Sequence, residues 1–207
     1  MTKLPLLEKA TELAFTAHKG QYRKGTQIPY VNHLCEVTSR VAHYLSALSD
    51  DGTMFGATKD EILAASMLHD YIEDCAGKYS YIKDEFSEVV AILVQECTRE
   101  DDHETKALKL AFMTSFKSKS SASILIKIAD RFCNVMDYYR TDGKKKYASK
   151  YALQAYTLYS EFFKRELDEI FLLTLDDVDD LRKIVHEEYS ISIFMPNHED
   201  EVKEIVT

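Results

Sequence analysis

Residues that break regular structure are scarce in this chain, which has only 6 glycines and 3 prolines among 207 residues. Few turn-forming residues favour long helices over many short strands joined by tight turns. A sustained alternation of apolar and polar residues, the pattern of a half-buried strand, is also missing. We therefore expect an all-α protein.

An excess of positive charge is missing as well, since 26 lysines and arginines stand against 35 aspartates and glutamates, a net charge of -9. This balance argues against a general nucleic-acid binder, which usually has a basic face. It is compatible with a small anionic substrate, because a metal ion and a few local cations can hold phosphates inside an acidic protein.

Paired cysteines and long apolar runs are absent too. No two of the four cysteines form a CxxC pair, which argues against a zinc site built from thiolates. Free, buried thiols fit a reducing cytoplasm. The N-terminal residues carry charges throughout their apolar stretch, unlike a signal peptide, and no apolar run approaches the roughly 20 residues that span a bilayer. We expect a cytoplasmic protein without membrane contact.

Apolar residues recur at helical spacing along most of the chain. The expected helices cover residues 5–19, 30–48, 58–69, 82–98, 104–116, 120–139, 144–175 and 177–189. The connections 20–29, 49–57 and 71–81 are predicted to be loops. Thr58 and Glu61 have the spacing of a capping box at the start of the third helix. We expect a single compact domain over residues 1–190 and a short, peripheral acidic tail over residues 191–207.

The sharpest chemical signal is the pair His69 and Asp70 at the end of the apolar run 62–68. Imidazole and carboxylate together suit a first-row divalent metal ion. His33 lies on the apolar side of the second expected helix, where a histidine in the core is the alternative. Asp130 lies in the most apolar helix, where a buried carboxylate needs a cation or a paired side chain such as Arg131.

Further polar residues are spaced to act beside this set. Glu73 and Asp74 follow His69 and Asp70 by four residues each, so one more helical turn would bring them to the same point. They would then accept a proton or position a water molecule; ordinary loop charges are the alternative. Asn134 lies one turn after Asp130 and could reach a ribose hydroxyl, or instead bond the helix backbone.

A basic loop precedes the His33 helix. Within residues 18–30, Arg23 can stack its guanidinium group on a base, and Lys24 can bind an acceptor atom or a phosphate. A solvated basic loop explains the same residues equally well.

Three sequence blocks occur in order: AHKGQYRKGTQIPYVNHL, then LHDYIEDC, then KIADRFCNVMDYY. Together they resemble the hydrolase domain of the RelA/SpoT alarmone family over roughly residues 9 to 160. The family pattern is a histidine–glycine–glutamine–arginine loop that ends in proline–tyrosine and a histidine. It continues with HD and ED separated by two residues, and then with alanine–aspartate–arginine and an asparagine four residues after that aspartate.

The resemblance implies an HD-type helical fold and one Mn²⁺ ion, with other divalent first-row metals as alternatives. The implied metal ligands are His33, His69, Asp70 and Asp130. Glu73 and Asp74 match the catalytic acidic pair, and the implied substrate contacts are Arg23, Lys24 and Asn134. The implied reaction removes the 3′-pyrophosphate from (p)ppGpp, giving GDP or GTP and pyrophosphate, as in the stand-alone small alarmone hydrolases. The implied partner is a small nucleotide, without nucleic acid or membrane, and the oligomeric state is not readable.

Two residues depart from the family pattern. Tyr71 stands after HD where the family usually has valine or alanine, and Cys75 stands after ED where it usually has a small hydroxyl residue. If both lie in the pocket wall, together with residues near 106–109, the substrate could be another nucleotide, such as NADPH losing its 2′-phosphate. A non-enzymatic module that binds a nucleotide is a third hypothesis.

Overall fold

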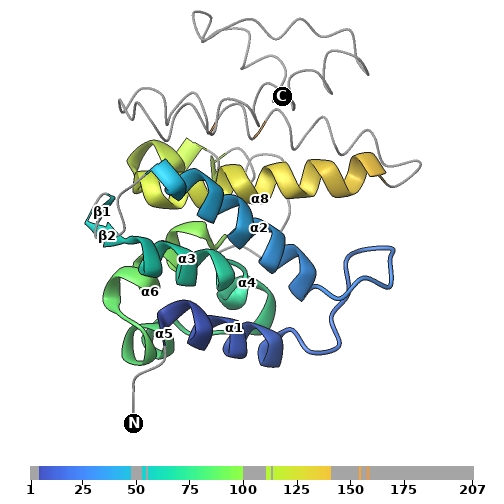
Figure 1. Cartoon of the computed structure of the whole chain (residues 1–207), viewed down its shortest axis with the longest axis horizontal. Coiled ribbons are helices and arrows are strands. Elements are labelled where there is room, and N and C mark those ends of the chain that lie inside the picture. Colours follow the sequence, from blue (N-terminus) through green and yellow to red (C-terminus); the bar gives the residue numbers. More distant parts are fainter. Residues whose placement is uncertain are drawn as a thin grey trace, which may run out of the picture. The chain divides into compact units, whose positions relative to one another are not determined.

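The computed structural model of the chain describes residues 5–47, 53–54, 56–99, 111–112, 114–140, 154 and 158. Over these residues the architecture is helical, as expected, and the only named strands are the two short ones β1 (Thr53–Met54) and β2 (Ala57–Thr58) (Figure 1). These strands pair in antiparallel register inside the segment predicted to be a loop. No helix among the described residues is both long and apolar enough to cross a membrane.

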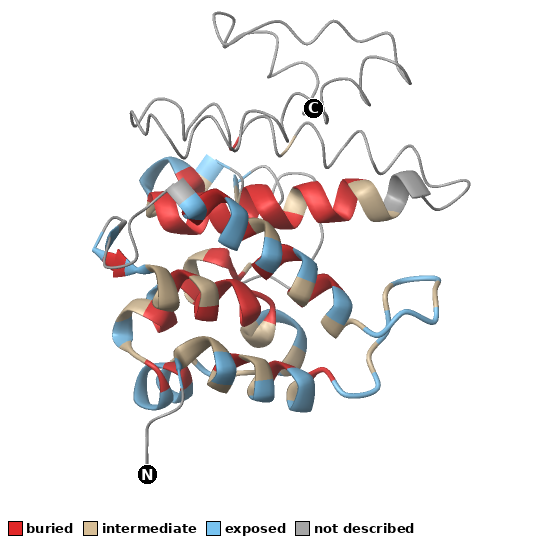
Figure 2. Cartoon of the chain, in the orientation of Figure 1, coloured by how far each residue is buried: buried red, intermediate tan, exposed pale blue. Residues whose placement is uncertain are grey.

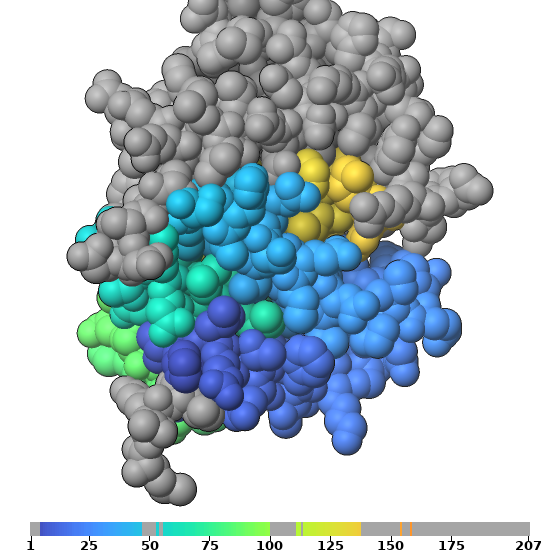
Figure 3. Space-filling model, in the orientation of Figure 1, coloured from blue at the N-terminus to red at the C-terminus, as the bar shows by residue number. Residues whose placement is uncertain are grey.

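The first two predicted helices are confirmed with slightly shorter bounds. Helix α1 covers Leu6–Ala17 and follows Pro5, whose fixed φ suits a helix start. Helix α2 covers Val31–Tyr44 and continues into the short 3₁₀ helix η1 (Leu45–Ala47). The connection between them projects from the helices (Figure 1) and lies at the molecular surface (Figure 3).

The predicted capping box is confirmed at the start of helix α3 (Lys59–Met67). The Thr58 hydroxyl accepts a hydrogen bond from the backbone N–H of Glu61, and the Glu61 carboxylate accepts one from the backbone N–H of Thr58. The other oxygen of Glu61 accepts a hydrogen bond from the hydroxyl of Ser87. The cap therefore also ties the start of α3 to the start of a later helix.

The prediction of a loop over residues 71–81, followed by one helix over 82–98, was wrong. The segment forms the short helix α4 (Tyr71–Cys75), then helix α5 (Tyr79–Glu85), and helix α6 (Glu88–Cys97) starts anew. Ser87 causes the interruption, because its hydroxyl caps the N–H of Val90. Helix α4 ends at Ala76, which has a left-handed backbone with φ of 52°.

Helix α3 lies at the centre of the packing, in contact with α1, α2 and α6, while α5 packs on α6. Residues 64–67 of α3 and Leu68 directly after it are all buried, as the red ribbon in Figure 2 shows. This apolar environment leads directly into His69 and Asp70, so the fold holds the buried end of α3 at the candidate site.

Helix α8 (Ser121–Arg140) confirms the helix predicted over residues 120–139. Its residues 121–130 are all buried, and near its start the Glu96 carboxylate accepts hydrogen bonds from the backbone N–H and hydroxyl of Ser120. Contacts between residues divide the chain into two compact units, one of residues 1–100 with 120–129 and the other of residues 101–119 with 130–207. The division falls inside α8, which is one continuous helix.

The later part of the chain is described only in places. The 3₁₀ helix η2 (Phe116–Ser118) lies at the end of the helix predicted over residues 104–116. Gln154 and Leu158 are helical, and Leu158 is buried. The remainder of the helices predicted over 144–175 and 177–189, and the tail predicted over 191–207, lie outside the described residues.

Candidate metal site and its surroundings

His33 and His69 face one another in the interior of the protein. Helix α2 carries His33 on its buried face, and His69 follows the end of helix α3; both side chains are almost completely buried. Their rings meet edge to face, with centroids 5.6 Å apart. The sequence prediction that His33 lies on an apolar helix face is confirmed.

The ring of His69 is held by the backbone of its own helix. Its Nδ1 atom lies 2.8 Å from the carbonyl oxygen of Ser66, which can only accept a hydrogen bond. The proton therefore sits on Nδ1, and in the neutral ring Nε2 keeps a lone pair. A hydrogen bond of this kind is the usual way in which proteins orient a metal-binding histidine.

Asp70 brings a carboxylate oxygen to both histidines. Its Oδ2 atom lies 3.0 Å from Nε2 of His69 and 3.9 Å from Nε2 of His33. With the His69 proton on Nδ1, the 3.0 Å approach joins two acceptor atoms. Such an approach is stable when a cation lies beside both, either a second proton on the imidazole or a metal ion.

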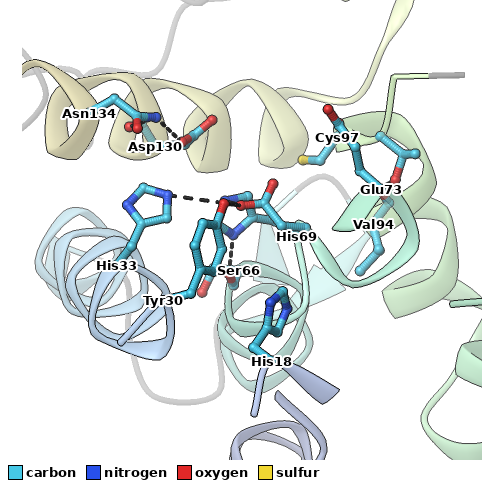
Figure 4. A network of polar contacts seen from close by, with 12 residues as sticks. His18, Tyr30, His33, Ser66, His69, Glu73, Val94, Cys97, Asp130 and Asn134 are labelled. Atoms are coloured by element: carbon cyan, nitrogen blue, oxygen red, sulfur yellow. Dashed lines mark hydrogen bonds and ion pairs between the residues drawn. The ribbon is translucent and has the colours of Figure 1, made fainter. Parts of the chain in front are cut away.

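Asp130 completes a group of metal-binding type. The ligand atoms of His33, His69 and Asp130 all lie within 4.8 Å of one another, and all three residues are buried. Figure 4 labels the three residues, His33 on α2, His69 after α3 and Asp130 on α8. Asp130 directly follows the buried Ala129 in helix α8, so the position of its Cα atom is fixed by the helix. Two imidazoles and carboxylate oxygen suit a divalent first-row metal ion, and this group contains three of the four predicted ligands.

The carboxylate of Asp130 is oriented from its own helix. The side-chain amide of Asn134 donates hydrogen bonds to Oδ1 of Asp130 at 2.5 Å and to its backbone oxygen at 2.9 Å. A guanidinium nitrogen of Arg131 lies 3.8 Å from Oδ2. Asn134 was predicted to contact a ribose, with a bond to the helix backbone as the alternative. The structure contains that backbone bond and adds one to the carboxylate.

Asp74 lies on α4, the additional helical turn that the sequence spacing required. Burial raises its pKa above the ordinary value, and the charge of Asp70 raises it further, whereas the nearby hydroxyl of Tyr30 opposes the shift. A carboxylate with a raised pKa holds a proton more readily. Asp74 therefore lies close enough to Asp70 for the two carboxylates to interact electrostatically.

Glu73 points elsewhere. Its carboxylate accepts hydrogen bonds from the backbone N–H of Arg99 at 3.2 Å and from the Arg99 guanidinium group at 3.0 Å. Figure 4 draws Glu73 apart from the two histidines, on the side of helix α6. The predicted catalytic pair is thus divided between two surroundings, one beside Asp70 and one beside Arg99.

The basic loop is an ordered hairpin. Tyr22 and Pro29 form a β-bridge, and Arg23 donates its backbone N–H to the oxygen of Ile28. The Arg23 guanidinium carbon lies 5.5 Å from the centre of the Tyr30 ring. Lys24 is exposed on the same loop. Arg23 therefore makes a cation–π contact with the tyrosine that precedes helix α2.

Tyr30 is a polar residue at the site that sequence reasoning missed. Its hydroxyl donates a hydrogen bond to Oδ2 of Asp70 at 2.7 Å, across 40 positions of the chain. Its ring stacks on that of His18, with centroids 5.1 Å apart and planes 12° apart. Tyr30 belongs to the first of the three sequence blocks, but nothing in the local pattern indicates a partner so distant in sequence.

The two unusual residues after HD and ED have different positions. The Tyr71 ring packs toward Gly77, where an added Cβ would lie 2.4 Å from it, and its centroid lies 6.3 Å from that of Tyr81. Tyr71 therefore contacts the connection from α4 to α5. The Cys75 sulfur lies 3.4 Å from Nε2 of His18. Residues 106–109, the other predicted wall, lie outside the described residues.

Comparison with known proteins gives relatives of the expected kind. The chain is 31% identical over 121 residues to the guanosine-3′,5′-bis(diphosphate) 3′-pyrophosphohydrolase MESH1 of Drosophila melanogaster, covering 58% of this chain and 62% of the relative. It is 30% identical over 176 residues to the bifunctional (p)ppGpp synthase/hydrolase SpoT of Escherichia coli K12, covering 79% of this chain and 23% of the relative. These similarities confirm the resemblance to the RelA/SpoT proteins.

A solved structure supports the same fold. It belongs to a metazoan ortholog of SpoT described as hydrolysing ppGpp, and it superimposes with a TM-score of 0.68 at 21% sequence identity. The match covers 88% of this chain and 97% of that chain. The chain spans less than two thirds of the length of the Drosophila relative and about a quarter of SpoT. A family model described as HD domain matches residues 10–166, and the chain therefore belongs to the HD-domain family.

Proposed function

We propose that this protein is a metal-dependent hydrolase that removes the 3′-pyrophosphate from (p)ppGpp. The observation that carries the proposal is the buried group of His33, His69 and Asp130, with the carboxylate of Asp70 beside both histidines. The similarity to proteins named as guanosine-3′,5′-bis(diphosphate) 3′-pyrophosphohydrolases supports the choice of substrate.

The proposed cofactor is one Mn²⁺ ion, held by His33, His69, Asp70 and Asp130. When bound, it supplies a water molecule of lowered pKa and positive charge against the phosphate oxygens. Four protein ligands leave coordination positions open for water and substrate. The burial of these side chains supports the assignment, because carboxylates in such surroundings need a cation nearby.

Asp74 is proposed to accept a proton from the attacking water. Addition of the water oxygen to the phosphorus attached at the 3′ position breaks the bond from that phosphorus to the 3′ oxygen. The pyrophosphate group departs with the water oxygen, and the 3′ oxygen receives the proton that Asp74 accepted, giving GDP or GTP. The raised pKa of Asp74 supports this role, since a stronger base accepts a proton more easily.

Glu73, the second member of the acidic pair, is proposed to assist hydrolysis through its contact with Arg99. Arg23 and Lys24 are proposed to contact the guanine, a role supported by their place on the loop whose Tyr30 reaches Asp70, with Arg23 lying over the ring of that tyrosine. Asn134 is proposed to contact the ribose with the part of its amide that does not serve Asp130. The proposed partner is thus a small nucleotide, met in the reducing cytoplasm that the free cysteines fit.

The test is a comparison of substrates under one set of conditions. The purified chain, stripped of metal and then supplied with Mn²⁺, is incubated with ppGpp, pppGpp and NADPH at equal concentration. The proposal expects pyrophosphate from the first two and much less phosphate from NADPH. Phosphate release from NADPH alone would move the reaction to a 2′-phosphatase, and tight binding of ppGpp without product would point to a binding module.

A further inference from the structure

The contact between Tyr30 and Asp70 joins the loop after α1 to the proposed metal site. Tyr30 precedes helix α2, whereas Asp70 lies between α3 and α4. Their 2.7 Å hydrogen bond runs from a phenol to a carboxylate, a pairing stronger than one between neutral groups. The oxygen that accepts it, Oδ2, is the same atom that approaches Nε2 of His69 at 3.0 Å.

The ring of Tyr30 has little freedom to turn away. One face stacks on His18, and its edge meets the ring of His33 with centroids 5.6 Å apart. The guanidinium group of Arg23 lies over the ring as well. Figure 4 shows the Tyr30 ring among the labelled histidines, with its hydroxyl at the centre of the site. Three surrounding side chains thus decide where the hydroxyl points.

His18, which supports the ring, is itself fixed. Its side chain is almost fully buried, and Nδ1 lies 2.7 Å from Oε1 of Gln21. The Gln21 amide nitrogen donates to the backbone oxygen of Asp74, so its other atom, Oε1, must accept. His18 therefore carries its proton on Nδ1, and its Nε2 faces the thiol of Cys75. The support for Tyr30 is anchored on α4, the helix that also carries Asp74.

A carboxylate on a short side chain can present either oxygen to a metal ion, and the angle at which it does so affects affinity. Partners that hold ligands in orientation commonly change metal affinity or activity by about 10 to 100 fold when removed. Tyr30 has the geometry of such a partner, because its hydroxyl reaches one oxygen of Asp70 and its ring is fixed on both sides.

We propose that Tyr30 is a positioning residue, whose hydroxyl holds the Asp70 carboxylate in the orientation that binds the metal ion. The inference rests on the metal site of the proposed function and deepens it, but it does not depend on which nucleotide is the substrate. Tyr30 acts through Asp70 and takes no part in bond breaking.

The test replaces Tyr30 by phenylalanine, which keeps the ring and removes only the hydroxyl. Metal affinity is measured on the metal-stripped full chain by titration with Mn²⁺, followed by electron paramagnetic resonance of the free ion, without any nucleotide. We expect the dissociation constant to rise by about tenfold or more in Tyr30→Phe. Tyr22→Phe is the matched control, because Tyr22 is an exposed tyrosine of the same loop, and we expect no change there.

A second measurement separates positioning from catalysis. Turnover of ppGpp by Tyr30→Phe is followed as Mn²⁺ is raised, with thermal unfolding recorded to compare folding with the parent chain. A positioning role predicts that saturating Mn²⁺ restores most of kcat and leaves KM for the nucleotide unchanged. Unaltered Mn²⁺ affinity would overturn the inference, and so would a kcat that stays low at saturating metal. If the parent chain binds Mn²⁺ but hydrolyses no ppGpp, the proposed substrate fails while the metal titration still decides the role of Tyr30.

Discussion

Glu73 and Arg99 form a two-point contact, in which one carboxylate receives both the backbone N–H and the guanidinium group of the same arginine. Arg99 follows helix α6, so this contact ties α4 to the end of α6. It gives Glu73 a defined orientation that differs from that of its neighbour Asp74. The two members of the acidic pair should therefore respond differently to substitution.

We expect Glu73 and Arg99 to act as one unit. Glu73→Gln and Arg99→Met should each lower kcat, and the double variant should be little worse than either single one, with a coupling of about 1 kcal/mol or more. A double-mutant cycle on kcat measures this. Losses that simply add would mean that Glu73 acts independently of Arg99. Asp74→Asn, which removes the proposed proton acceptor, should lower kcat more than Glu73→Gln or Arg99→Met.

Asn134 offers a separate test on the other side of the site. Because its amide donates to the Asp130 carboxylate, Asn134→Leu should weaken Mn²⁺ binding in the absence of nucleotide. Isothermal titration with Mn²⁺ measures the effect, and Asp137→Asn, a change outside this hydrogen bond on the same helix, serves as the control. An increase in KM for ppGpp with unaltered metal affinity would assign Asn134 to the ribose alone.

The thiol of Cys75 should react slowly. Burial raises its pKa, and the charges of Asp74 and Asp70 raise it further, while the hydrogen bond from Gln21 acts in the opposite direction. A raised pKa lowers the thiolate fraction near neutral pH, and the thiolate is the form that is alkylated. Labelling with iodoacetamide, read by mass spectrometry of the Cys75 peptide, should be slower than for free cysteine and should accelerate above pH 9.

Rapid labelling of Cys75 at pH 7, with the chain folded, would contradict this description of its surroundings. Cys75→Ser provides a companion variant, because a hydroxyl can still donate to Nε2 of His18. We expect this variant to retain the Mn²⁺ affinity and the turnover of the parent chain within about twofold, since Cys75 contacts His18 and is not one of the proposed metal ligands.

The capping box at Thr58 should be worth a measurable part of the stability. Thr58→Ala removes the hydroxyl that caps the N–H of Glu61, and we expect the free energy of unfolding to fall by about 1 kcal/mol. Chemical denaturation measures it, and Thr58→Ser, which keeps the cap, is the matched control. Equal stability of the alanine and serine variants would show that the cap contributes nothing.

Much of this architecture was readable from the sequence because it depends on local patterns. Apolar spacing located α1, α2 and α8, and Thr58 with Glu61 located the start of α3. The burial of His33 was predictable because the residue lies on the apolar face of α2. A polar partner for Asp130 was predictable because a carboxylate in so apolar a helix needs a cation or a hydrogen-bond donor nearby.

The features that sequence reasoning missed are helices too short for a periodic pattern and contacts between residues far apart in the sequence. Helix α4 has only five residues, too few for a periodic pattern, although Gly77 just after it is a typical residue for the end of a helix. Ser87 was available as a capping signal, but the helical spacing of Ile82, Phe86 and Val90 continues across it and concealed the break. The contact from Tyr30 to Asp70 spans 40 positions and arises only once α2 and α3 have packed.

The central claim is that a divalent metal ion held by the two histidines and two aspartates drives removal of pyrophosphate from ppGpp. The most direct test measures pyrophosphate release by the metal-stripped chain before and after addition of Mn²⁺, alongside folded Asp70→Ala and Asp130→Ala variants. The account predicts no release without metal, rapid release with Mn²⁺, and loss of release in both variants. Full activity in either variant, or equal activity without metal, would contradict it.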